Sequence, residues 1–271
     1  STVPTGSGLS SSAALEVSVA LALSADHAWD GPLRKRELAK LARSAENEFV
    51  GVPCGIMDQF ASVFGEQNAA IQIDCRSLEY EIAPVSEKVS IVAVNTMVRH
   101  ELGQSAYRER VEQCAAAVWA IRAGSGRKVE SLRDASEEDL RFISDPVARR
   151  RARHIVTENC RVDRFVAALR KGNFAAGGRL FQESHHSLKK DFEVSCLELD
   201  FLVDVAVPVE GVYGARMTGG GFGGCTVNLI APEAVKFFEQ TVGEAYRKRF
   251  GIVPEFYCVQ PSAGAGKISS R

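Results

Sequence analysis

The sequence lacks the features that mark membrane, disulfide-stapled and zinc-binding proteins. It has no apolar run long enough to cross a bilayer, because Glu16 and Ser18 interrupt the longest apolar stretch, residues 13–23. Its seven cysteines are scattered, with no closely spaced Cys-x-x-Cys pair and no Cys/His metal spacing. This usage is typical of reduced, buried thiols in a cytoplasmic protein and argues against a disulfide framework.

A strong charge of either sign is also missing. Lys and Arg total 33 against 34 Asp and Glu, which leaves a net charge of −1. The overall charge therefore gives no reason to expect nucleic acid or an acidic membrane surface as a partner. Hydrophobic residues at 45% and charged residues at 25% are ordinary for a globular chain of 271 residues. This composition excludes disorder, collagen and coiled coil, and the length suits one large or two ordinary domains.

Standard nucleotide-binding motifs are absent, since there is neither a Walker A loop nor a Rossmann fingerprint. A Gly/Ser-rich segment at 4–13 instead leads directly into an apolar helix that we expect to be buried. Its glycines let backbone N–H groups converge, while the hydroxyls and the helix N-terminus add donors and positive potential. A flexible linker is the alternative. We predict a phosphate-binding loop made of Gly6, Ser7, Gly8, Leu9, Ser10, Ser11, Ser12 and Ala13.

Two carboxylates flank a Gly/Pro-rich turn at 51–55. Glu46 ends one predicted helix, and Asp58 begins a short one that runs toward Phe64. Beside a phosphate site, one carboxylate could hold Mg²⁺ while the other meets the attacking hydroxyl. The alternative is a solvated Glu and an N-capping Asp, and these residues alone favour that alternative.

A second glycine-rich loop lies between predicted strands 212–217 and 225–230, with five glycines in six positions. So many glycines suggest a hairpin whose backbone approaches a neighbour closely, because a plain turn does not need them. The loop consists of Gly219, Gly220, Gly221, Phe222, Gly223 and Gly224. By contrast, the basic run at 149–154 and the pair His185–His186 are interpreted as solvated surface.

The order of predicted elements indicates an α+β fold, because helices come in runs and strands cluster toward the two ends. Helices are predicted near 32–49, 104–123, 136–143, 146–170, 173–189, 196–206 and 232–250. Strands are predicted near 71–73, 80–82, 89–94, 212–217, 225–230 and 255–259.

Taken together, the motifs resemble the galactokinase family of GHMP kinases. The matching blocks are Gly-Leu-Ser-Ser-Ser-Ala at 8–13, Cys-Gly-Ile-Met-Asp-Gln at 54–59, Ile-Asp-Cys-Arg-Ser-Leu at 73–78, Glu-Ser-His at 183–185, Arg-Met-Thr-Gly-Gly-Gly-Phe-Gly-Gly-Cys at 216–225, and the end at 256–266. The resemblance implies the GHMP kinase fold. An incomplete ribosomal-S5-domain-2-like N-terminal domain would span 1–88, and a ferredoxin-like α+β domain would span 89–271.

The resemblance also implies roles for the candidate residues. The loop 6–13 would embrace the ATP phosphates, and Glu46 would hold Mg²⁺ with a hydroxyl from Ser11 or Ser12, which the sequence does not distinguish. Asp58 would lie beside the C1 hydroxyl of galactose, as a general base or as an orienting group, with Gly55 and Tyr107 in the sugar pocket. The loop 219–224 would pack against the phosphate-transfer region. The implied reaction converts ATP and α-D-galactose to ADP and galactose 1-phosphate.

One part of the family pattern is not found here, namely a signature like Arg-Val-Asn-Leu-Ile-Gly-Glu-His near the N-terminus. We therefore expect an N-terminally truncated galactokinase with little or no kinase activity by itself, and exposed apolar surface around 13–23 and 71–82. A related kinase, such as an N-acetylgalactosamine kinase, and a non-catalytic galactokinase-like sugar sensor are the alternatives. The intact serine and alanine run at 10–14 favours an enzyme. We expect galactose and ATP as partners, neither nucleic acid nor membrane, and a monomer for the complete enzyme.

Overall fold

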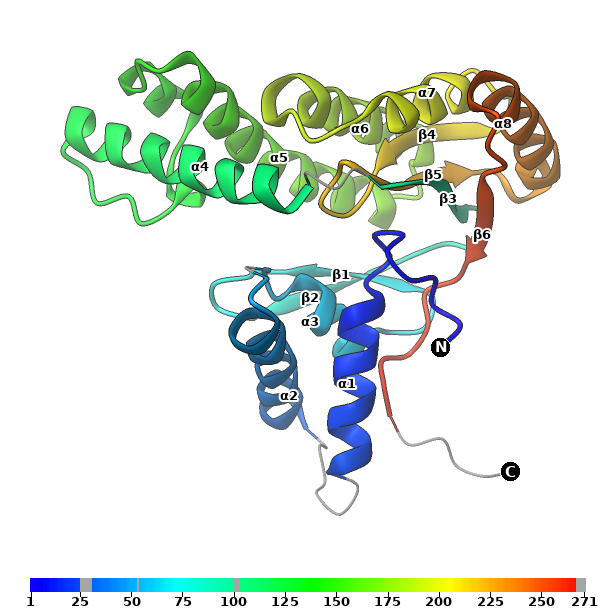
Figure 1. The fold of residues 1–271 in the computed structure, drawn as a ribbon, viewed down its shortest axis with the longest axis horizontal. Coiled ribbons are helices and arrows are strands. Elements are labelled where there is room, and N and C mark those ends of the chain that lie inside the picture. Colours follow the sequence, from blue (N-terminus) through cyan, green and yellow to red (C-terminus); the bar gives the residue numbers. More distant parts are fainter. Residues whose placement is uncertain (25–30, 53, 100–102, 267–271) are drawn as a thin grey trace.

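A computed structural model describes residues 1–24, 31–52, 54–99 and 103–266, which form two units lying one above the other (Figure 1). The first unit holds three helices, a π-helical turn and a hairpin. These elements are α1 (Ser11–Leu23), α2 (Pro32–Ser44), η1 (Ala45–Val50), α3 (Met57–Phe64), β1 (Ala69–Ile73) and β2 (Tyr80–Pro84). The chain then enters the second unit at β3 (Ser90–Arg99). The division expected at 88/89 falls between β2 and β3 and stays a prediction.

The second unit is built on a four-stranded antiparallel sheet. Its strands lie in the order β4 (Val212–Met217), β5 (Gly223–Ile230), β3 and β6 (Glu255–Val259). Counted along the chain, this is the 2-3-1-4 order of a ferredoxin-like β-α-β-β-α-β arrangement. Its helices are α4 (Gly103–Ser125), α5 (Pro146–Arg170), α6 (Phe174–Ser187), α7 (Leu197–Ala206) and α8 (Val235–Phe250), and its short helical turns are η2 (Leu132–Asp134), η3 (Glu137–Phe142), η4 (Leu188–Phe192) and η5 (Pro232–Ala234). The predicted α+β fold is therefore confirmed.

The sheet of the second unit packs against α7 and α8 to form a hydrophobic core. Val92 and Val94 of β3 are buried there against Leu202 of α7 and Phe238 of α8. Alternating β3 residues face this core because successive side chains of a strand point to opposite sides. The core also fixes the far end of β3, since the buried Tyr246 hydroxyl donates a 2.8 Å hydrogen bond to the Thr96 carbonyl.

After β6 the chain returns to the first unit, as the red trace in Figure 1 shows. The Gly264 and Ala265 amides donate to the carbonyls of Gly65 and Ser62 at 2.7 and 2.8 Å. A Cβ atom on Gly65 would lie 2.8 Å from the Ser262 carbonyl oxygen, so the close approach needs a glycine there. The two units are thus connected by two passages of the chain.

Polar pairs also join the two units along the side of the β1–β2 hairpin. Asp74 receives two hydrogen bonds from Arg133, at 2.6 and 2.5 Å, and Asp134 receives two of 2.8 Å from Arg76. Further along, Gln72 donates to Asp163 of α5 at 2.8 Å. Two reciprocal bidentate pairs of this kind constrain how the two units are oriented more than single ion pairs would.

Several expectations about burial are wrong. Helix α1 is not buried all round, because α2 and α3 cover one side of it, leaving Leu15 64% and Leu23 84% exposed. Apolar exposure around 13–23 was itself expected and is confirmed, and Ile82 of β2 is 37% exposed. The seven cysteines are free, but Cys75, Cys160 and Cys258 are exposed rather than buried.

The basic run and His185 are not simply solvated surface. Arg151 is 2%, His154 4% and His185 5% exposed, whereas His186 is exposed. The physical reason is that α5 and α6 pack on each other and on η4. The Arg151 guanidinium is compensated there by Gln113 Oε1 at 2.7 Å, the Asp191 carbonyl at 2.6 Å and Glu193 Oε2 at 2.5 Å. Within the described ranges, no helix is long and apolar enough to span a membrane.

Candidate active site

The predicted phosphate loop winds tightly before α1. Gly6 and Gly8 have φ angles of 67° and 77°, and Ser10, left-handed at 62°, occupies the N-cap position of α1 without a side-chain cap hydrogen bond. Ser7 is 1% exposed and donates its hydroxyl to the Pro4 carbonyl at 3.0 Å, so this hydroxyl is used within the loop. Ala13 faces the interior and is fully buried. The hydroxyls left at the open end of the helix are therefore those of Ser10, Ser11 and Ser12, with Leu9 beside them.

The glycine-rich loop between β4 and β5 lies directly on this phosphate loop. A Cβ atom on Gly219 would lie 3.2 Å from the Gly8 carbonyl oxygen, and one on Gly224 would lie 2.8 Å from the Ser7 carbonyl oxygen. Side chains at these two positions would push the loops apart, which explains two of the glycines physically. Gly220 differs from them, since a Cβ there would meet nothing within 4 Å. The remaining members, Gly221, Phe222 and Gly223, carry the turn back into β5.

Three carboxylates converge from three elements of the first unit. Glu46 lies in η1, Asp58 in the first turn of α3, and Glu16 in the second turn of α1. Burial raises the pKa of Glu16 to about 7, together with its hydrogen bond to Glu46 and the nearby charges of Glu46 and Asp58. These contacts bring the two predicted site carboxylates onto one side of α1.

Asp58 does not serve as a helix cap. The N-cap residue of α3 is Ile56, and no side-chain cap hydrogen bond is present there. The capping role considered from the sequence therefore does not explain Asp58, whose carboxylate lies among the charged groups around Glu16. Gly55 precedes it beside open space, since an added Cβ would meet nothing within 4 Å.

Tyr107 reaches the same region from α4 of the second unit. Its pKa is raised by burial, and further by the charges of Cys54 and Asp58. Its side chain is 37% exposed. The predicted catalytic carboxylate and the predicted sugar-pocket tyrosine thus come from different units, and the candidate site lies where the units meet.

Asn47 holds the turn between Glu46 and Asp58 in place. Its Oδ1 accepts from the Cys54 amide at 2.8 Å, and its Nδ2 donates to the Cys54 carbonyl at 3.3 Å. Arg43 donates to the same carbonyl at 3.3 Å. The π-helical turn η1 prolongs α2 so that Asn47 and Glu46 both reach the turn, and such π turns often occur at functional sites.

Sequence reasoning missed three residues of this site, namely Glu16, Asn47 and Gln59. Gln59 is 2% exposed and donates from Nε2 to Glu16 at 3.2 Å. A signal for Glu16 was present, because it is the lone acidic residue of an apolar helix and follows Ser12 by one helical turn. Asn47 and Gln59 carried no comparable signal, since their partners are distant or are backbone atoms.

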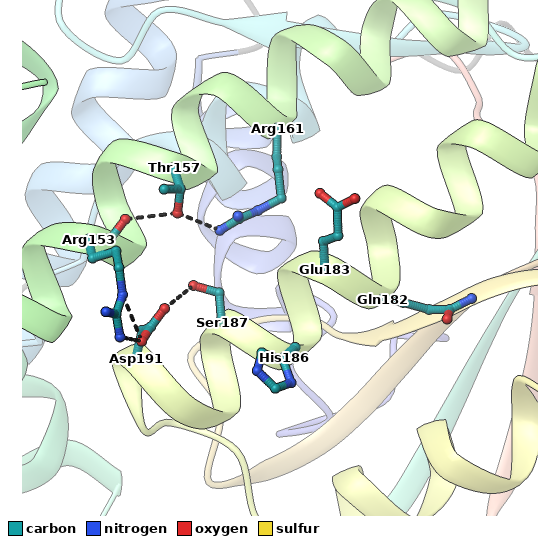
Figure 2. A pocket seen from close by; sticks show the side chains of 8 residues that line it. All are labelled: Arg153, Thr157, Arg161, Gln182, Glu183, His186, Ser187 and Asp191. Carbon is teal, nitrogen blue, oxygen red and sulfur yellow. Dashed lines mark hydrogen bonds and ion pairs between the residues drawn. The ribbon is translucent and has the colours of Figure 1, made fainter. Parts of the chain in front are cut away.

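The structure also has a polar pocket of about 550 Å³ between α5 and α6 (Figure 2). Arg153 is paired there with Asp191, and Thr157 accepts from Arg161 at 3.0 Å. Neither this pocket nor a second one of about 480 Å³ beside it is lined by a predicted site residue. They are therefore separate from the candidate active site.

Comparison with known proteins shows the family of the chain. The GHMP kinase N-terminal domain matches residues 1–66, and the GHMP kinase C-terminal domain matches residues 165–248. The chain is 43% identical to a galactokinase of Roseiflexus sp. (strain RS-1), with 99% of this chain and 68% of the relative covered. It is 45% identical to a galactokinase of Thermotoga maritima, with 99% and 74% covered.

A solved structure extends the comparison to three dimensions. The crystal structure of Lactococcus lactis galactokinase complexed with galactose matches with a TM-score of 0.91 at 40% identity. The match covers 98% of this chain and 69% of that one. At this identity and coverage, the chain belongs to the galactokinase family of GHMP kinases, which are ATP-dependent sugar kinases.

Proposed function

We propose that the protein transfers the γ-phosphate of ATP to the C1 hydroxyl of α-D-galactose in a Mg²⁺-dependent reaction, giving ADP and galactose 1-phosphate. The observation that carries this proposal is that Glu46 is hydrogen-bonded to Glu16 of α1, just beyond the phosphate loop, with the charge of Asp58 nearby. Phosphoryl transfer needs positioning and charge stabilisation more than covalent chemistry from the protein. A helix N-terminus beside carboxylates supplies these two requirements.

The donor set fits Mg²⁺. This ion prefers oxygen ligands and is usually held by one or two carboxylates together with substrate phosphates and waters. Among the described residues no group of three or more His, Cys, Asp and Glu forms a metal cage, and this mode of binding does not require one. Glu46 is the proposed carboxylate ligand. When bound, Mg²⁺ would offset the charge on the phosphate oxygens.

Ser12 is the better of the two serine candidates for this ion. Residues four apart lie on the same face of a helix, so Ser12 shares a face of α1 with Glu16. Glu16 contacts Glu46, which means that this face is turned toward the proposed ligand. Ser12 is also the more exposed of the pair, whereas Ser11 is partly covered. We therefore propose Ser12 as the hydroxyl ligand.

The galactose C1 hydroxyl would lie beside Asp58. Its oxygen attacks the γ-phosphorus as the bond to the ADP oxygen breaks, and its proton passes to Asp58 if that carboxylate acts as a base. If Asp58 only orients the hydroxyl, the proton leaves with the product instead. Tyr107 and Gly55 would border the sugar. The seven free thiols suit the cytoplasmic location that we propose, and the proposed partners are ATP and galactose alone.

The decisive experiment replaces the proposed catalytic carboxylate. In the full-length protein, Asp58→Asn should lower galactose-dependent ADP release by about 10²- to 10⁴-fold. ATP affinity, measured by titration calorimetry, should change much less, because Asp58 is not proposed to touch ATP. The matched control is Glu48→Gln, an exposed carboxylate near Glu46 that accepts from the Ser44 hydroxyl. A rate for Asp58→Asn within threefold of wild type would refute the proposed role.

Substrate choice separates the proposal from its alternatives. Galactose, N-acetylgalactosamine and other hexoses are offered under identical conditions, and the product is located by phosphorus NMR. We expect galactose to give the highest kcat/KM and a phosphate on C1. Preference for N-acetylgalactosamine would indicate the related kinase. Binding of ATP and galactose by the full-length protein without turnover would indicate a sugar sensor.

A further inference from the structure

His185 of α6 contacts the backbone at the base of the glycine-rich loop. Its Nδ1 accepts a hydrogen bond from the Met217 amide at 3.2 Å, and the ring is 5% exposed. Met217 is the last residue of β4, so the loop 219–224 begins just beyond it. Since Nδ1 is the acceptor, it carries no proton, and the neutral ring must hold its proton on Nε2.

Asp200 of α7 faces the other side of this ring. The His185 Nε2 atom lies 3.3 Å from Asp200 Oδ1, a close electrostatic contact rather than a well-aligned hydrogen bond. The carboxylate also accepts from the Ser195 hydroxyl at 2.6 Å and pairs with Lys189 at 3.0 Å. Burial would raise the pKa of Asp200, but its contacts with His185, Ser195 and Lys189 outweigh burial and lower the pKa to about 2. A permanently charged Asp200 therefore favours the ring with its proton on Nε2.

The rest of the glycine-rich loop is held by contacts further along. The Phe222 amide donates to the Val194 carbonyl at 2.8 Å, and the buried Thr96 hydroxyl donates to the Gly224 carbonyl at 2.8 Å. His185 thus acts at the start of the loop, Val194 in its middle and Thr96 at its end. Both ends of the loop meet the phosphate loop, the start through Gly219 against Gly8 and the end through Gly224 against Ser7.

We propose that His185, oriented by Asp200, is a positioning residue that holds the Met217 amide and so sets where the glycine-rich loop meets the phosphate loop. The proposal rests on the proposed function, because it takes the phosphate loop to bind ATP. His185 touches neither substrate, so its effect on phosphoryl transfer is exerted through the backbone of 217–219. If His185 only filled space in the core, a replacement side chain would not need a hydrogen-bond acceptor at the position of Nδ1.

The first test measures the loop itself. Hydrogen exchange of residues 217–225 is followed by mass spectrometry in wild type and four variants of the full-length protein. His185→Leu removes the acceptor, and exchange in this segment should rise at least about tenfold. His185→Asn restores an acceptor, because its Oδ1 is as many bonds from Cα as Nδ1 is, and exchange should fall back to within about threefold of wild type. The matched control, His186→Leu, replaces the exposed neighbour that points toward the α5–α6 pocket (Figure 2) and should change nothing at 217–225.

The second test measures the reaction. His185→Leu should raise KM for ATP about tenfold while KM for galactose stays within twofold, and His185→Asn should recover most of the ATP affinity. If the substitution only destabilised the fold, it would lower the amount of active protein and leave the KM for ATP and the KM for galactose both unchanged. Asp200→Asn, which leaves the histidine in place, should give intermediate exchange and supplies the answer if His185→Leu does not fold.

The outcomes separate this inference from the proposed function. Exchange at 217–225 within twofold of wild type in His185→Leu, or in Asp200→Asn if the leucine variant does not fold, would overturn the role of His185. So would equal exchange in the leucine and asparagine variants. If the wild type neither bound ATP nor phosphorylated a sugar, the proposed function would fail, while the exchange measurements would still decide whether His185 positions the loop.

Discussion

The side-chain amide of Gln59 donates a 3.2 Å hydrogen bond to the carboxylate of Glu16, and so joins α3 to α1 beneath the candidate active site. Glu16 in turn is hydrogen-bonded to Glu46. Two carboxylates can share a hydrogen bond only if one of them carries a proton. The contact therefore makes the stability of the first unit depend on pH.

Glu16→Gln should remove part of that pH dependence. The folded-state pKa of Glu16, about 7, lies above its ordinary value of 4.5, so the folded state holds the proton more tightly than the unfolded state does. The stabilisation is complete below about pH 4.5 and is lost as the pH rises toward 7. At pH 8 the variant should be more stable than wild type, because its neutral amide places no second charge beside Glu46. The expected difference is about 1 to 2 kcal/mol, since the site is only partly buried and solvent screens the charges. Urea unfolding without divalent metal at pH 5 and pH 8 measures this, and equal differences at both pH values would contradict it.

Gly224→Ala should separate the two glycine-bearing loops. The position has a φ of 82°, and an added Cβ would lie 2.8 Å from the Ser7 carbonyl oxygen. The left-handed backbone alone costs a non-glycine residue about 1 to 2 kcal/mol, and relief of the clash must move the phosphate loop. We expect ATP affinity to fall about tenfold or more in calorimetry, since tenfold corresponds to 1.4 kcal/mol. Gly220→Ala, which meets open space, is the control and should bind ATP like wild type. Equal affinities in the two variants would argue against contact between the loops in solution.

Asn47→Ala should loosen the turn that carries Cys54 toward Asp58. The change leaves the Cys54 amide without its side-chain acceptor at 2.8 Å and should cost about 1 to 2 kcal/mol of stability. We also expect kcat to fall, because small displacements of catalytic groups reduce phosphoryl transfer. Asn47→Asp keeps an acceptor for the amide and should lose less on both measures. A stability loss with kcat unchanged would show that the turn does not position Asp58.

Arg133→Glu should weaken the contact between the two units. It would place a carboxylate opposite Asp74, whose pKa is held well below its ordinary value, chiefly by its hydrogen bonds from Arg133. The unfolding temperature should fall, and more so at low salt, since screening weakens repulsion between exposed charges. The double variant Asp74→Arg with Arg133→Glu should recover most of the loss. Lys128→Glu makes the same change of charge at a side chain that is 87% exposed, and should lower the unfolding temperature little.

The sequence by itself determined the element order, the α+β class and the two glycine-bearing loops. These features follow from local patterns, because apolar periodicity, helix breakers and glycine clusters act within a few residues of the chain. The motif containing Glu46 and Asp58 was visible for the same reason, although its chemical meaning came from resemblance rather than from the residues. The proposed choice of Ser12 over Ser11 rests on the face of α1 that carries Glu16, which the sequence did not place.

Tertiary structure decided everything that depends on distant contacts. The apolar composition of α1 predicted a buried helix, yet which faces are covered depends on where α2 and α3 pack. Neighbours His185 and His186 look alike in sequence, but only His185 is enclosed, by α7 and the end of β4. Glu16, Asn47 and Gln59 act on partners that only folding brings near. The burial of a residue and its hydrogen-bond partners depend on the packing of elements that are remote in the chain. A local pattern therefore predicts that an element forms more reliably than it predicts what the element packs against.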